Sequence, residues 1–163
     1  MPELPSGLDW CSDLELRRLW PANCGALLLH LLRLSPEDRY ARFGVTLNDA
    51  ALGYWIERQD WRCHRWWGVW DDADACLHGA LQLSPVGEPG DWELALSIAE
   101  PLRRRGLGTA LLAQAVRDTP DATRLFCHQG HTALAAMARR LGWATRKDRA
   151  LALELLPGTA AGA

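Results

Sequence analysis

The chain has 163 residues, 48% of them hydrophobic, and carries a formal net charge of -2. This length fits one ordinary domain with a substantial hydrophobic core, which excludes an intrinsically disordered protein. The small negative charge excludes a general attraction to nucleic acid or to an anionic membrane.

Along the chain, we expect a flexible leader over residues 1–12, a single domain over 13–156 and a flexible tail over 157–163. Hydrophobic periodicity and turn residues predict the elements between them. In chain order these are a strand within 13–20, helices following Pro21 and Ser35 and over 46–58, strands at 65–71, 75–85 and 92–100, a helix at 109–116, a strand at 123–128, a helix at 131–141 and two strands within 144–155. This order predicts a mixed sheet with helices packed on it.

The five cysteines are odd in number and include no CxxC pair, which favours a reducing compartment and therefore the cytoplasm. Three short Cys-His groupings occur, at Cys63-His64, Cys76-x-His78 and Cys127-His128-x-x-His131. Their spacings do not match the usual paired zinc ligands, so we expect no metal. No apolar stretch reaches the length needed to cross a bilayer, and we expect neither a membrane nor a nucleic-acid partner.

An arginine- and glycine-rich turn follows the strand at 92–100 and precedes a helix: Arg103-Arg104-Arg105-Gly106-Leu107-Gly108. The two glycines let the backbone approach a bulky anion, and the helix that follows directs free N–H groups toward it. The segment therefore predicts a phosphate or pyrophosphate site, with a simple connecting turn as the alternative. A dinucleotide fingerprint would need a small residue in place of Leu111, and a P-loop would need Gly-Lys-Ser/Thr.

The stretch RRRGLGTALL resembles the acetyl-CoA-binding motif of the GNAT superfamily of N-acetyltransferases, Arg/Gln-x-x-Gly-x-Gly/Ala, at Arg103, Gly106 and Gly108. The downstream stretch HTALAAMARRLGW resembles the family's next motif, which commonly ends in Leu-Gly-Phe. The upstream LSPEDRYARF is similar to a segment in relatives of bacterial protein-lysine acetyltransferases. The resemblance spans residues 13–156. It implies an α+β, three-layer acyl-CoA N-acyltransferase fold, with a mixed, mostly antiparallel sheet of six to seven strands flanked by helices.

The resemblance also implies that acetyl-CoA is the cosubstrate and that its acetyl group moves to a primary amine, on a small molecule or a protein lysine. The amine would attack the thioester directly, without an acyl-enzyme. The cofactor-binding residues implied are Ile98, Ala99, Arg103, Arg104, Arg105, Gly106, Leu107, Gly108, Thr109 and His131. Among these, the backbone N–H groups around Ile98 and Ala99 would bind the pantetheine and polarise the carbonyl.

A protonated amine needs a general base, and the resemblance favours Glu93, early in the central strand, over Glu100. A solvated or ion-paired role for Glu93 stays open. Many relatives protonate the leaving thiolate with a tyrosine, but that position is Ala138 here and no tyrosine follows Tyr54. The thiolate then leaves unassisted, through water, or with help from Cys127, His128 or His131, of which His131 is our catalytic candidate. His131 could instead cap its helix.

Other interpretations remain open at this point. The missing tyrosine supports a non-catalytic acyl-CoA-binding sensor as the alternative to an enzyme. Five tryptophans lie between Trp55 and Trp70, and they either fill the core or help to shape the acceptor site. A homodimer is also compatible with the sequence.

Overall fold

The computed structural model describes residues 13–127, 132–147 and 153–160. The elements run in the order β1 (Leu14–Leu19), η1 (Pro21–Asn23), α1 (Cys24–Leu32), α2 (Pro36–Phe43), α3 (Asp49–Glu57), β2 (Arg65–Asp71), β3 (Cys76–Pro85), β4 (Asp91–Ile98), η2 (Glu100–Leu102), α4 (Leu107–Arg117), β5 (Arg124–Cys127), α5 (Thr132–Arg140), β6 (Trp143–Lys147) and β7 (Leu153–Ala160). This order confirms the one predicted from the sequence.

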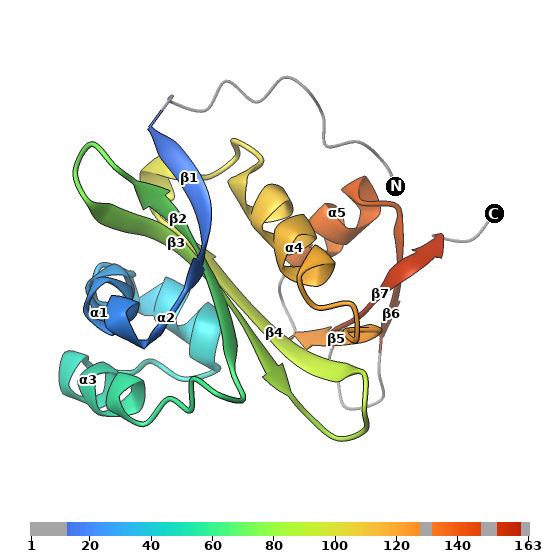
Figure 1. Cartoon of the computed structure of the whole chain (residues 1–163), viewed down its shortest axis with the longest axis horizontal. Helices are drawn as coiled ribbons and strands as arrows, with labels where there is room; N and C mark the ends of the chain where they lie inside the picture. The colour runs from blue at the N-terminus through green and yellow to red at the C-terminus, as the bar shows by residue number, and fades with distance from the viewer. Residues whose placement is uncertain (1–12, 128–131, 148–152, 161–163) are drawn as a thin grey trace.

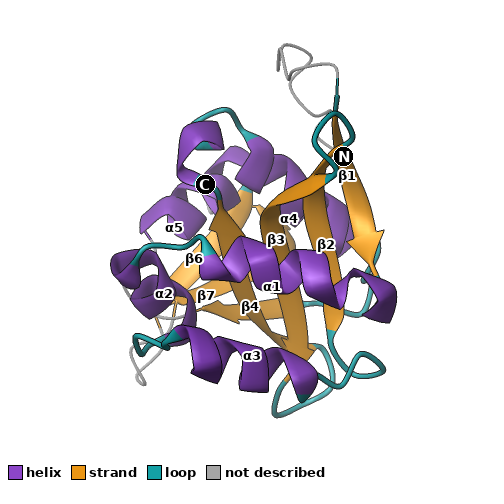
Figure 2. Ribbon diagram, turned by 90° about the vertical axis from the view of Figure 1, so that its left-hand side faces the viewer, coloured by secondary structure: helices purple, strands orange, loops and turns teal. Residues whose placement is uncertain are grey.

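One seven-stranded sheet forms the centre of the molecule, in the order β1-β2-β3-β4-β5-β7-β6. Every neighbouring pair is antiparallel except β4 and β5, which are parallel. Helices α1, α2 and α3 cover one face, and α4 and α5 cover the other (Figures 1 and 2). The predicted three-layer α+β fold is therefore confirmed.

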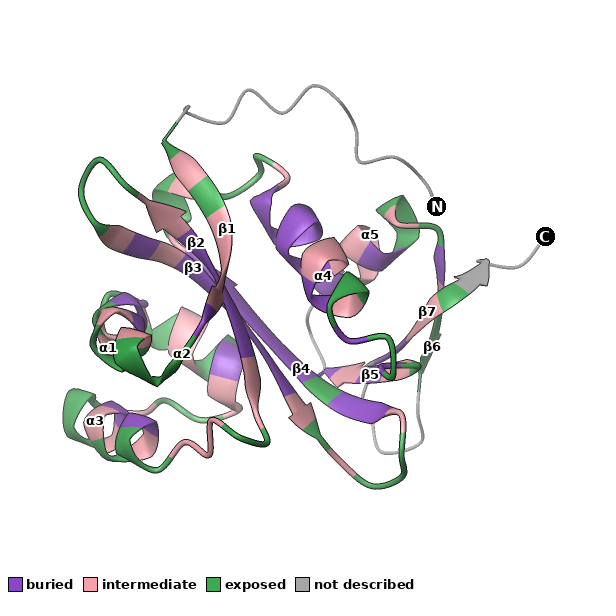
Figure 3. Cartoon of the chain, viewed as in Figure 1, coloured by how far each residue is buried: buried purple, intermediate pink, exposed green. Residues whose placement is uncertain are grey.

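Two hydrophobic clusters form the core, one on each face of the sheet, because successive strand residues point to opposite faces. Trp66 packs on the side of α1 to α3 and Trp67 on the side of α4 and α5, and both are almost fully buried. Figure 3 shows this burial along the central strands. Trp67 also donates from Nε1 to Asp118 Oδ2 at 2.8 Å, which fixes the end of α4 to β2.

Local sequence signals explain several helix boundaries. Ser35 Oγ accepts from the Asp38 amide at 3.1 Å, and Asn48 Oδ1 accepts from the Ala51 amide at 2.8 Å, so both side chains cap helix starts. Gly142, at φ 72°, follows the end of α5 as expected.

Several boundaries differ from the sequence expectation: β4 ends at Ile98 and not at position 100, and α3 covers Asp49–Glu57 within the expected 46–58. Helix α4 begins at Leu107, two residues before the expected start at position 109, and β7 runs to Ala160, past position 156, where we expected the tail to begin. No described helix has the length and apolar character needed to cross a membrane.

Candidate functional site

The described pairing of the central strand β4 with its neighbour β5 covers only the first three residues of β4. The parallel pairing of described residues ends at Glu93 and Phe126, whereas β4 continues to Ile98. The edge of β4 from position 94 to 98 therefore has no β5 partner within the described chain. A second extended group with amide and carbonyl functions can pair with such an edge in the manner of an added strand.

The direction of the β4 backbone groups decides which of them face this open edge. The Ala99 amide donates to the His78 carbonyl of β3 at 2.7 Å, so it points away from the gap. Backbone groups alternate along a strand, which turns those of Leu96 and Ile98 toward the side of β5. The Ala99 N–H, which we expected to face a bound pantetheine, is thus engaged within the sheet, and the backbone groups at the open edge are those of Leu96 and Ile98.

The turn after β4 has a backbone shaped for close approach. Arg104 lies at φ 64° and Gly106 at φ 80°, both in the left-handed region. Gly106 is the N-cap of α4, and no side chain caps that end in the described structure. The first intrahelical bond joins the Ala110 N–H to the Gly106 carbonyl at 3.0 Å. The amides of the residues before Ala110 have no intrahelical acceptor.

This helix end is unusual because it is buried and yet uncapped. Leu107, Gly108 and Thr109 are all buried, and Thr109 Oγ1 has no hydrogen-bond partner in the described part of the chain. An anion placed here would accept from the free amides and the hydroxyl and would lie at the positive end of the helix dipole. The site therefore fits a pyrophosphate group. Arg104 and Arg105, exposed and without a side-chain partner among the described residues, would add positive charge beside it.

Arg103, the first arginine of the motif, differs from Arg104 and Arg105 because its side chain is bound within the protein. Arg103 donates from Nε to the Ile98 carbonyl at 2.8 Å and from Nη2 to Asp38 Oδ2 of α2 at 2.7 Å. Its guanidinium thus joins the end of β4, the turn and the start of α2. We expected a cofactor ligand at Arg103, and the structure shows a side chain already engaged with the protein. No local pattern predicts the contact between Arg103 and Asp38, since 65 residues separate the two in the chain.

Gly108, the last glycine of the motif, has a packing role. A Cβ at this position would lie 2.6 Å from Met137 Cε, 3.2 Å from Met137 Sδ and 3.5 Å from Leu96 Cδ2. The absence of a side chain therefore lets α4 approach α5 and the sheet closely. This requirement is independent of any ligand.

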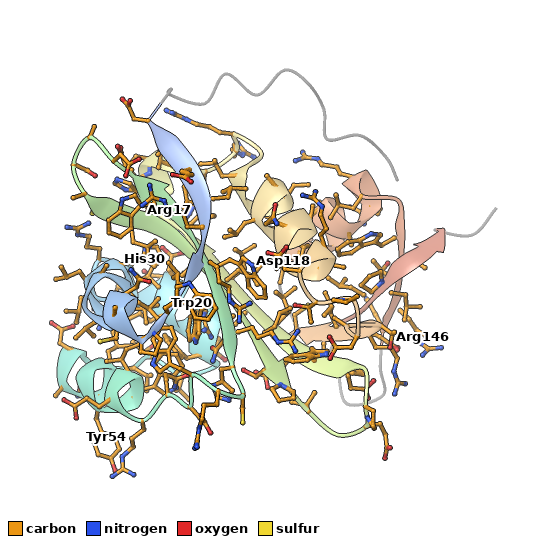
Figure 4. The ribbon with its side chains drawn as sticks, in the orientation of Figure 1. Arg17, Trp20, His30, Tyr54, Asp118 and Arg146 are labelled. Atoms are coloured by element: carbon orange, nitrogen blue, oxygen red, sulfur yellow. The ribbon has the colours of Figure 1, made fainter. Side chains whose placement is uncertain are left out.

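Polar groups lie on the other face of β4, under α1 and α2. His30 Nε2 lies 2.8 Å from Ser97 Oγ, and both side chains are buried (His30 is labelled in Figure 4). Arg42 Nη2 donates to Gln82 Oε1 at 2.6 Å, and its guanidinium lies 4.8 Å from the centre of the Phe43 ring. Burial lowers the pKa of Arg42 to about 10, and the negative charge of Glu93 opposes that shift.

The predicted base Glu93 is exposed and lies at the last β4 position paired with β5, on the sheet face of Gln82 and Ser97. It is therefore at the end of the described pairing of the two strands. Glu100 is also exposed but begins η2 at the opposite end of β4. The geometry places Glu93, and not Glu100, beside the buried Arg42.

Of the groups considered as proton donors to a leaving thiolate, the structure describes only Cys127. Cys127 ends β5 as a buried thiol, and burial raises its pKa to about 12, which makes it a poor proton donor to a thiolate whose ordinary pKa is lower. Ala138, in place of the tyrosine, is fully buried in α5. His128 and His131 lie outside the described residues.

The tryptophan-rich segment contributes mainly to the core. Trp66 meets Trp55 edge to face and Trp61 at a tilt, each with a centroid distance of 5.9 Å, and Trp55 meets Phe43 edge to face at 5.0 Å. The Arg42 guanidinium contacts three of these rings, at 5.6 Å from the centre of Trp55, 5.8 Å from that of Trp66 and 4.8 Å from that of Phe43.

Comparison with known proteins gives a consistent result. A family model described as the acetyltransferase (GNAT) family matches residues 26–143. The fold is similar to the GNAT domain of S. lividans PAT (15% identity over 94% of this chain and 98% of that one, TM-score 0.66). It is also similar to a ribosomal-protein-S5-alanine acetyltransferase from Vibrio fischeri (10% identity over 88% of this chain and 91% of that one, TM-score 0.63). A third similar structure is the paia N-acetyltransferase from Thermoplasma acidophilum in complex with coenzyme A (16% identity over 87% of this chain and 96% of that one, TM-score 0.57). No curated protein matches the sequence significantly.

Proposed function

The chain belongs to the acetyltransferase (GNAT) family and is an acyltransferase, and we propose that it moves an acetyl group from acetyl-CoA to a primary amine by direct attack. The observation that carries this proposal is the open edge of β4 leading into a buried, uncapped helix start. An extended thioester arm ending in a pyrophosphate has the two features this arrangement would bind, an amide-bearing chain and an anion.

In this proposal acetyl-CoA supplies the activated acetyl thioester, and the protein supplies its position. Leu96 and Ile98 would pair with the arm, while the amides of Leu107, Gly108 and Thr109 would hold the pyrophosphate. Arg104 and Arg105 would add charge. An N–H group of the open edge would also stabilise the oxyanion that forms when the amine attacks. Holding both reactants in the attack geometry accounts for several kcal/mol of the barrier.

Glu93 is the proposed general base. A free lysine amine has a pKa of about 10.4 and is protonated at neutral pH, so a carboxylate must remove a proton directly or through a water. The exposed position of Glu93 at the end of the described pairing of β4 with β5 allows an acceptor to reach it. His131 stays our candidate for assisting the thiolate.

The acceptor class stays a small-molecule amine or a protein lysine. One of the similar structures is a ribosomal-protein-S5-alanine acetyltransferase and another is the paia N-acetyltransferase, so the proteins that share this fold do not point to one acceptor. At identities of 10–16% these likenesses concern the fold alone.

The cofactor site is tested by thermal unfolding with and without acetyl-CoA. Ligand at about 100 times its dissociation constant adds about 2.7 kcal/mol to the free energy of unfolding. An Arg104→Ala, Arg105→Ala variant should lose much of that shift. Arg139→Ala, Arg140→Ala at the end of α5 is the matched control, since it removes two adjacent exposed arginines that lie outside the turn. No shift in the native chain would refute the proposal.

Catalysis is tested separately by release of free CoA against a panel of amines and lysine peptides. Glu93→Gln should bind acetyl-CoA like the native chain but lower kcat at least about a hundredfold. An unchanged pH profile and rate in this variant would remove Glu93 from the mechanism. Binding without CoA release for any amine would favour the acyl-CoA sensor.

A further inference from the structure

The hairpin between β2 and β3 gathers metal-binding side chains outside the proposed active site. One potential ligand atom each from Asp74, Cys76 and His78 lie within 4.8 Å of one another. The ladder between β2 and β3 is irregular here, since Val69 pairs with Gly79 and Trp70 with Leu77, so that His78 has no pairing partner on β2. Asp74 precedes Cys76 and His78 in the turn.

Asp71 places a second carboxylate near the imidazole of His78. Asp71, the last residue of β2, pairs with Cys76 across the hairpin, and its Oδ2 lies 3.8 Å from His78 Nε2. Asp74 Oδ2 lies 3.2 Å from the same nitrogen. The side chains of Asp71 and His78 are about three-quarters buried, whereas that of Asp74 is half exposed, so an ion could enter from solvent beside Asp74.

We propose that Asp71, Asp74, Cys76 and His78 form a binding site for a divalent cation of the zinc class. A thiolate, an imidazole and two carboxylates give four donors of the types that Zn²⁺ takes in tetrahedral sites. A sulfur and a nitrogen among four donors disfavour Ca²⁺ and Mg²⁺, which take oxygen ligands. Sequence spacing alone predicted no metal here because the two carboxylates reach the Cys-x-His pair only through the hairpin.

Arg33, near the end of α1, is the competitor for this site. Its Nη1 donates to Cys76 Sγ, so in the metal-free chain a guanidinium provides the positive charge that the cluster attracts. A bound cation has to displace it. Replacement of Arg33 by glutamine should therefore strengthen metal binding, an effect that nonspecific surface binding would not show.

The site lies beside the cofactor end of β4. The His78 carbonyl accepts the Ala99 amide at 2.7 Å, four residues before the motif arginine Arg103. A cation held by His78 would therefore stiffen the strand that supports the start of the proposed pyrophosphate turn, without contacting acetyl-CoA.

The test is a Co²⁺ titration of the reduced full-length chain, followed by absorption spectroscopy. We expect a thiolate-to-cobalt charge-transfer band and tetrahedral d–d bands that saturate at one equivalent and disappear when Zn²⁺ is added. Cys76→Ser should remove the charge-transfer band, His78→Ala should weaken binding at least tenfold, and Arg33→Gln should strengthen it. Cys63→Ser is the matched control, because Cys63 also lies beside a carboxylate, at 3.4 Å from Asp60, but outside the cluster.

A second measurement uses only the native chain and therefore does not depend on whether the variants fold: the protection of cysteine thiols from alkylation by bound Zn²⁺. Zn²⁺ should slow the alkylation of Cys76 in the native chain and leave Cys63 unaffected, as read by peptide mass spectrometry. Absence of a charge-transfer band in the native chain, its persistence in Cys76→Ser, or equal alkylation of Cys76 with and without Zn²⁺ would each overturn the proposal.

Discussion

The buried imidazole of His30 should make the fold less stable in mild acid. His30 is only 2% exposed, and its Nε2 contacts Ser97 Oγ. Burial first, and then the nearby charges of His78, Arg42 and two further arginines, lower its pKa from 6.5 to about 4. Protonation of this ring would leave a charge in the core beneath α1, so proton binding favours the unfolded chain.

The size and sign of the effect follow from linkage. The folded-state pKa is depressed, so the stabilisation is fully present above the unfolded value of 6.5 and declines as the pH falls toward 4. Each pH unit within that window changes the free energy of unfolding by about 1.4 kcal/mol. Between pH 7 and pH 5 the loss attributable to His30 is therefore about 2 kcal/mol.

The assay is urea unfolding at pH 7 and pH 5 for the native chain and His30→Gln. Glutamine can still hydrogen-bond Ser97 but does not titrate, so the stability of this variant should be less sensitive to acid. The variant should be less stable than the native chain at pH 7, because glutamine does not fill the buried space of the imidazole ring. We expect the native chain to lose about 2 kcal/mol more than the variant between the two pH values. Equal losses would refute the reasoning, because they would show that His30 has the same proton affinity in both states.

Three further predictions concern the cofactor turn and β5. Gly108→Ala should lower the free energy of unfolding by no more than about 1 kcal/mol, since the new methyl meets the flexible end of Met137 while the helix propensity of alanine offsets part of the cost, and the loss should be smaller in a Met137→Ala background. Arg103→Gln should cost more stability than Asp38→Asn because it also removes the bond to the β4 carbonyl; a double-mutant cycle should give a coupling of about 0.2–1 kcal/mol, and a coupling of zero would mean the ion pair adds nothing. Cys127 should resist thiol reagents at pH 8 until the chain is unfolded, as followed by mass spectrometry; rapid labelling of the native chain would contradict its burial and raised pKa.

The sequence alone determined the order of the elements and predicted the turn rich in arginine and glycine, because both depend on neighbours in the chain. Alternation and periodicity of apolar residues place strands and helices, and Ser35, Asn48 and Gly142 end or begin helices through bonds and dihedral angles within a few residues. Glycine and arginine in Arg103-Arg104-Arg105-Gly106-Leu107-Gly108 indicate an anion site for the same local reason.

Contacts across the sheet and between layers were decided only by the tertiary structure. The register of β4 on β3 engages the Ala99 amide and turns Leu96 toward the open edge, and a shift of one residue would reverse this. The packing of α1 and α2 brings His30 to Ser97 and Asp38 to Arg103 across more than sixty residues of chain. Such pairs carry no local signal, because their energies arise from burial and geometry that exist only once the layers have assembled.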